Sequence, residues 1–96
     1  MQDEKSRALF AQLVIMFQAA GMQHLGKIKN PVTDAVERDL DQAQMMIDLL
    51  EMLEAKTKGN LSSEESGFLG NVVRELKLNY VDERSKPDAE PPSETS

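Results

Sequence analysis

The chain has 96 residues, enough for one domain with a single modest core. Its net charge of −6 and its pI of about 4.7 argue against nucleic acid and anionic membranes as partners, because cations are needed to neutralise phosphates. It contains no cysteine, which excludes disulfides and thiolate metal sites and makes a reducing cytoplasm the simpler location. We expect one helical domain over residues 6–83, between a frayed N-terminus at 1–5 and a disordered tail at 84–96.

The first predicted helix covers about residues 7–25, with Ser6 as N-cap and Gly26 as its stop. Leu9, Leu13 and Phe17 share one face, yet the opposite side is apolar too. A helix that is apolar nearly all round is normally buried, and so small a chain has little else to cover both sides. The pattern therefore predicts a partner. The apolar runs are too short for a membrane span, and the N-terminus lacks the features of a secretory signal.

The second predicted helix covers about residues 33–58. Pro31 suits the start of a helix, and of the two candidate caps, Asn30 and Thr33, we favour Thr33. One apolar stripe runs along this helix and should face the core: Val36, Leu40, Ala43, Ile47 and Leu50. A second stripe, about half a turn away, consists of Met45, Leu49 and Met52.

A sharp corner separates the second helix from the third. Gly59 can take the left-handed conformation that ends a helix, and Ser62 with Glu65 forms a capping-box pattern. The third predicted helix, about 63–83, has a single apolar face and should form an antiparallel hairpin with the second. The tail at 84–96 is rich in Pro, Ser and Glu and cannot bury enough surface to fold.

The sequence contains few candidate residues for catalysis or metal binding. His24, the one histidine, has no carboxylate one turn away and no nucleophile with it, so packing is the favoured explanation. Five acidic residues could suggest a divalent metal, but helical spacing of carboxylates usually marks a solvated face: Asp34, Glu37, Asp39, Asp41 and Asp48. We therefore predict no catalytic residue, no cofactor and no metal site.

Several segments resemble a known family. They are Leu25-Gly26, Asn30-Pro31, the run from Ile47 through Lys56-Thr57-Lys58-Gly59-Asn60-Leu61 to Glu65, and Tyr80-Val81. In these residues the chain resembles a bacterial family of small helical proteins known as domain of unknown function 1844. The resemblance covers about Phe10 to Val81 and implies a bacterial, helical protein. It implies no activity, cofactor or site residue.

We expect a three-helix, all-α protein that is not an enzyme and that works as a homo-oligomeric interaction or adaptor protein, with a dimer favoured. A helical protein of another kind is the alternative partner. The predicted interaction surface comprises Ile15, Met22, Met45, Leu49 and Met52. The competing structural explanation is that a tilted third helix covers this surface. The competing functional one is a ligand-binding or enzymatic cleft near His24 and the acids of the second helix.

Overall fold

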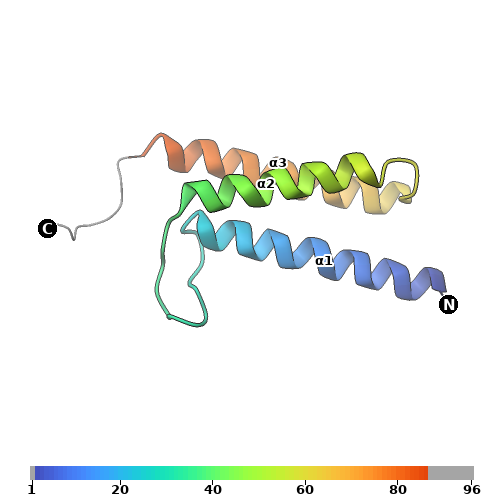
Figure 1. The fold of residues 1–96 in the computed structure, drawn as a ribbon, viewed down its shortest axis with the longest axis horizontal. Coiled ribbons are helices and arrows are strands. Elements are labelled where there is room, and N and C mark those ends of the chain that lie inside the picture. Colours follow the sequence, from blue (N-terminus) through green and yellow to red (C-terminus); the bar gives the residue numbers. More distant parts are fainter. Residues whose placement is uncertain (1, 87–96) are drawn as a thin grey trace, which may run out of the picture.

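The computed structural model describes residues 2–86, which form three α-helices. Helix α1 is Gln2–His24, α2 is Leu40–Lys56 and α3 is Ser63–Arg84. Figure 1 shows α2 and α3 as an antiparallel hairpin with α1 alongside, and each helix packs against both others. The predicted all-α architecture is confirmed. The predicted tail lies, from residue 87 on, outside the described residues.

One core fills the space between the three helices. Its largest fully buried side chains come from all three helices and from the end of α1: Val14, Leu25, Ile47, Leu50, Leu69 and Leu76. Partly buried side chains pack around them, among them Phe10, Phe17, Leu53, Phe68 and Tyr80. Each helix of such a bundle buries one side only, so the remaining apolar side chains of α1 and α2 stay at the surface.

The corner between α2 and α3 has the structure that its residues predict. Gly59 has a φ of 89°, in the left-handed region. The hydroxyl of Ser62 accepts a hydrogen bond from the backbone N–H of Glu65 at 3.1 Å, and the backbone N–H of Ser62 donates to the Glu65 carboxylate at 2.9 Å. Two donors at the start of α3 are thus satisfied within the corner itself.

The two ends of α1 differ in how well they match the prediction. Gly26, with a φ of 78°, follows the helix, and the N–H of Lys27 donates to the carbonyl of Met22 at 2.9 Å, so the predicted stop is confirmed. The start lies at Gln2 rather than at residue 7, so Ser6 is inside the helix and does not cap it. The acidic side chain of Glu4 in the first turn complements the helix dipole, which favours this earlier start.

The predicted start of α2 is wrong. The helix begins at Leu40 rather than at Thr33. Asp39 is its N-cap, and the Asp39 carboxylate accepts a hydrogen bond from the N–H of Gln42 at 3.1 Å. Val36, which the sequence places on the buried stripe of this helix, lies in the preceding loop and is 58 % exposed.

Asn30 explains why the helix does not start earlier. Its side-chain oxygen accepts hydrogen bonds from the N–H groups of Val32 at 2.8 Å and Thr33 at 3.4 Å. A short polar side chain that binds nearby N–H groups in this way stabilises a turn in competition with a helix. Asp34 then has a φ of 58°, which no right-handed helix contains.

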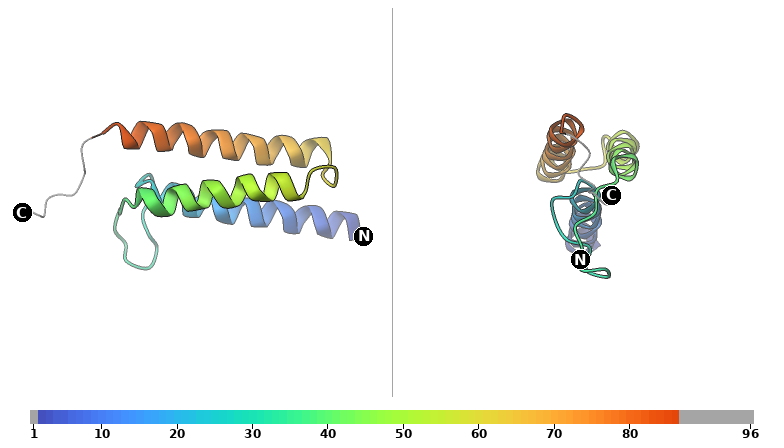
Figure 2. Two further views of the ribbon diagram at one scale, coloured as in Figure 1. Left: turned by 45° about the horizontal axis from the view of Figure 1, so that its top comes forward. Right: turned by 90° about the vertical axis from the view of Figure 1, so that its left-hand side faces the viewer.

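Residues 25–39, called here the connecting loop, form an ordered arm. Two isolated antiparallel bridges join Leu25 to Arg38 and Asn30 to Ala35. The N–H of Asp39 donates to the carbonyl of His24 at 2.7 Å, which closes the base of the loop. Figures 1 and 2 show the loop projecting past α1 at the end of the bundle where α1 ends and α2 begins.

A close contact between α1 and α3 lies at Gly21. A Cβ atom at this position would lie 2.9 Å from a methyl group of Leu76, so a larger residue would require the Leu76 side chain to shift. By contrast, a Cβ at Gly67 on α3 would meet no atom within 4 Å. With Gly21 against α3, the side of α1 that carries Leu9 faces outward.

Candidate functional site

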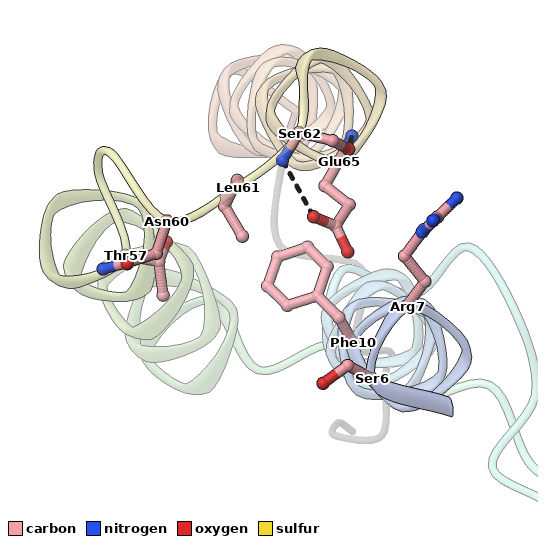
Figure 3. Close-up of a pocket in the computed structure, with 8 residues that line it drawn as sticks. All are labelled: Ser6, Arg7, Phe10, Thr57, Asn60, Leu61, Ser62 and Glu65. Atoms are coloured by element: carbon pink, nitrogen blue, oxygen red, sulfur yellow. Dashed lines mark hydrogen bonds between the residues drawn. The ribbon is translucent and has the colours of Figure 1, made fainter. Parts of the chain in front are cut away.

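Exposed apolar side chains form a stripe along α1. Leu9, Leu13 and Met16 are 59, 37 and 57 % exposed. Their spacing of four and three residues places them on one side of the helix, and Ser6, three residues before Leu9, continues the same side. In Figure 3, Ser6 points from α1 toward the side on which α2 lies, whereas Arg7 points away from α2. The stripe therefore follows the border of α1 with α2.

A second stripe runs along α2. Met45 and Met52 are 49 and 47 % exposed, and Leu49 between them is half-buried. The side of α2 next to α3 is marked by Glu51, which pairs with Lys77. At about 100° per residue, the stripe lies roughly 100–160° around α2 from Glu51. It therefore faces away from α3 and from the buried side of α2 that carries Ala43, Ile47 and Leu50.

Apolar side chains are thus exposed on two adjacent helices, and we call the two stripes together the α1/α2 face. Its members are Leu9, Leu13, Met16, Met45, Leu49 and Met52. Three of the six are methionines, whose unbranched thioether side chains adapt to the shape of a partner. Clustered apolar side chains at a surface are typical of an interaction site.

The structure separates the residues of the predicted interaction surface. Met45, Leu49 and Met52 lie together on the α1/α2 face. Ile15 is 49 % exposed, but it lies about 100° around α1 from its neighbour in the stripe, on the outer side of the helix. Met22 is half-buried and packs against the core.

The α1 half of the face is a surface that periodicity did not identify. Leu9 and Leu13 share a face with Phe17 in the helical pattern, but only Phe17 packs against the core. Because α1 is apolar in nearly every direction, the pattern alone cannot select its buried side. The useful signal is charge: no Asp, Glu, Lys or Arg occurs between Arg7 and Lys27, although the exposed positions of a surface helix are usually charged.

An open cavity of about 600 Å³ lies at the end of the bundle near the corner (Figure 3). Phe10 and Leu61 form its apolar wall, and Arg7 and Glu65 contribute charged groups. The Glu65 carboxylate is already engaged with the N–H of Ser62. The lining comes from α1 and from the corner, so sequence patterns contain no signal for it, and its polar groups mainly serve the capping of α3.

A cluster of charges holds the other end of the bundle together. Glu83 is 7 % exposed, and its carboxylate pairs with the ammonium groups of Lys27 at 2.7 Å and Lys86 at 2.9 Å and with the guanidinium of Arg38 at 3.2 Å. The hydrogen bond from Lys27, followed by those from Lys86 and Arg38, lowers the pKa of Glu83 from 4.5 to about 2.

This Glu83 cluster ties both ends of the connecting loop to α3. Lys27 follows α1, Arg38 precedes α2, and Arg38 also donates to the backbone carbonyl of Glu83 at 2.9 Å. The sequence contains no signal for the cluster, because its members come from distant segments and helical or strand periodicity reports only on neighbours. Its evident role is to fix the position of the loop.

The residues considered for chemistry lie apart from one another. His24 is half-buried in the last turn of α1. Asp34 pairs with Lys29, and Asp48 accepts a hydrogen bond from the side chain of Gln44. Within residues 2–86, no group of three or more His, Cys, Asp or Glu side chains could hold a metal ion. In the same part of the chain, no helix has the length and hydropathy needed to cross a membrane.

Comparison with protein families matches residues 7–83 to a family described as a domain of unknown function, DUF1844. The match spans the connecting loop and the corner as well as most of the three helices. No curated protein and no solved structure matches the chain. Because the family match covers more than half of the sequence, in agreement with the resemblance of the corner residues, the chain belongs to the DUF1844 family.

Proposed function

We propose that this protein is a non-enzymatic interaction protein that associates with a second copy of itself through the α1/α2 face. The observation that carries the proposal is the face itself, in which two adjacent helices present five exposed apolar side chains and the half-buried Leu49. Burial of apolar surface is favourable by about 25 cal/mol per Å², so a partner that covers this face gains free energy.

Charge supports a second copy as the partner. Two chains that each carry a net charge of −6 repel one another over most of their surfaces. The uncharged length of α1 between Arg7 and Lys27 lets two copies approach without placing like charges opposite each other. Two α1/α2 pairs face to face would also form a four-helix arrangement, whose core is built from side chains on facing helices.

The proposal is tested by placing a charge on the face. Met16→Asp and Met52→Asp alter side chains that are about half exposed in a single copy, so each variant should fold. In a dimer each would bury an unpaired carboxylate, and we expect the dissociation constant to rise roughly 100-fold. Sedimentation equilibrium over a range of concentrations measures the change, and circular dichroism checks the helix content.

Leu78→Asp is the matched control. Leu78 lies on α3 and is 66 % exposed, outside the α1/α2 face, and the variant introduces the same charge into a helix. The dimer of this variant should be as tight as that of the unaltered protein. A monomeric unaltered protein at high micromolar concentration would refute the proposal, as would equal weakening by all three substitutions.

A further inference from the structure

The connecting loop carries apolar side chains that the fold leaves uncovered. Val32 is 90 % exposed, and Ile28 and Val36 are 44 and 58 % exposed. The loop is nevertheless held in one conformation by the hydrogen bonds of Asn30 and by the Glu83 cluster at its base. An apolar tip on a fixed support loses little conformational entropy when it binds, which favours a contact with another molecule.

The two ends of the bundle differ in shape. At one end the connecting loop projects past α1, and at the other end α1 extends beyond the corner between α2 and α3 (Figure 1). Helix α1 has 23 residues and α2 has 17, so α1 is longer by roughly 9 Å at 1.5 Å per residue. The overhanging N-terminal end of α1 lies next to the Leu9 end of the α1/α2 face.

We propose that the connecting loop is an arm that packs onto the second copy, with Val32 against the N-terminal part of the second copy's α1, in an antiparallel dimer. This inference rests on the self-association proposed above. An antiparallel pair brings each loop to the overhanging α1 end of the other copy. A parallel pair would place both loops at one end and both overhanging ends at the other, so that neither loop would reach an overhanging end.

The antiparallel arrangement also follows the symmetry of the face. A two-fold axis across the middle of α1 lets the same surface of both copies meet, as an isologous interface requires. It sets the two α1 helices side by side with opposed dipoles. The arm then covers the rim of the interface at both ends, where Leu9 and Met52 would otherwise meet water.

Cross-linking tests this arrangement cleanly, because the chain has no cysteine. Single variants Ser6→Cys and Val32→Cys each introduce one thiol at an exposed position, and Ser6 lies on the Leu9 side of α1. Within one copy these positions are separated by most of α1, about 28 Å from Ser6 to Leu25 by the helical rise, so they cannot be bridged internally. A short bis-maleimide reagent and mild oxidation are applied to each variant alone and to the equimolar mixture.

We expect covalent dimers mainly in the mixture, joining Ser6→Cys of one copy to Val32→Cys of the other. Efficient cross-linking of Ser6→Cys with itself would indicate a parallel pair and overturn the inference. Absence of cross-links in samples that sediment as dimers would overturn it as well, while leaving the proposed self-association intact. A monomeric unaltered protein would instead remove the self-association on which the inference rests.

A second variant measures how much the arm contributes to the affinity of the dimer. Val32→Asp should leave the helix content unchanged, because Val32 makes few contacts within its own copy. We expect the dissociation constant to rise about tenfold, less than for Met52→Asp, because the arm contacts the rim of the interface. Unchanged affinity would assign the loop to another partner and overturn the inference.

Discussion

The two connections between the helices are built on different principles. The corner between α2 and α3 is stabilised by groups within itself: Gly59 ends one helix, and Ser62 and Glu65 cap the next. The connecting loop between α1 and α2 is held from outside, by Glu83 near the far end of the chain. A local connection can be recognised from a few adjacent residues, whereas a tertiary one becomes visible only when the helices are assembled.

The difference has a consequence for stability. A substitution in the corner affects one helix end, and its effect should be close to that of a cap in an isolated helix. A substitution in the Glu83 cluster affects α3 and both ends of the connecting loop at once. The two connections should therefore respond very differently to the removal of one polar group.

The largest effect is expected for Glu83→Gln. The substitution removes the carboxylate that Lys27, Arg38 and Lys86 share, and we expect the free energy of unfolding to fall by about 3 kcal/mol. Urea unfolding at pH 7 measures the loss. Asp82→Asn is the control, because Asp82 pairs with two of the same lysines but its side chain is 55 % exposed, and this variant should lose much less stability than Glu83→Gln. Equal losses would mean that burial of Glu83 is unimportant.

The free energy of unfolding should depend on pH through the Glu83 carboxylate. The pKa of Glu83 is lowered in the folded protein to about 2 from 4.5, so its contribution is complete above pH 4.5 and is lost as the pH falls toward 2. The difference in stability between the unaltered protein and Glu83→Gln should narrow by about 2 kcal/mol between pH 7 and pH 3. A difference that does not depend on pH would assign the effect to packing instead.

The glycines that follow α1 and α2 provide a comparison between two residues with similar, positive φ. Gly26 and Gly59 have φ values of 78° and 89°. A Cβ atom would fit at both positions, because its nearest neighbour at Gly26 would be 3.5 Å away and no atom lies within 4 Å at Gly59. Gly26→Ala and Gly59→Ala should each cost about 1 to 2 kcal/mol through left-handed strain. Thermal unfolding followed by circular dichroism would show whether the two losses agree. A much larger loss at Gly26 would indicate that the strain spreads to the neighbouring Arg38.

The smallest loss of stability is expected when the N-cap of α3, Ser62, is removed. Ser62→Ala removes the acceptor for the N–H of Glu65 and should lower the free energy of unfolding by about 1 kcal/mol. Ser66→Ala is the control, because Ser66 is exposed inside the same helix and has no capping role. Loss of the whole hairpin in Ser62→Ala would contradict the view that the corner is stabilised locally and additively.

Features that depend on neighbouring residues can be predicted from the amino-acid sequence alone. The three helices, the stop at Gly26, the corner at Gly59 and the capping box of Ser62 all follow from backbone preference and from spacing over a few residues. The exposed apolar side chains of α2, Met45 and Met52, were also predictable as a second stripe outside the core, and their role in an interaction stays a prediction. The start of α2 was not, since the side chain of Asn30 diverts the nearby backbone N–H groups into a turn.

The outward side of α1 and the position of the connecting loop become clear when the three helices are packed together. A helix that is apolar in nearly every direction has no periodic signal to orient it, and in the structure α1 approaches α3 closely where Gly21 meets Leu76. The Glu83 cluster likewise joins residues from opposite ends of the chain, and the energy of an ion pair depends on distance and burial, which no local pattern encodes. Short-range physics thus specified the helices and the corner, and long-range packing specified the face that we propose as the interface.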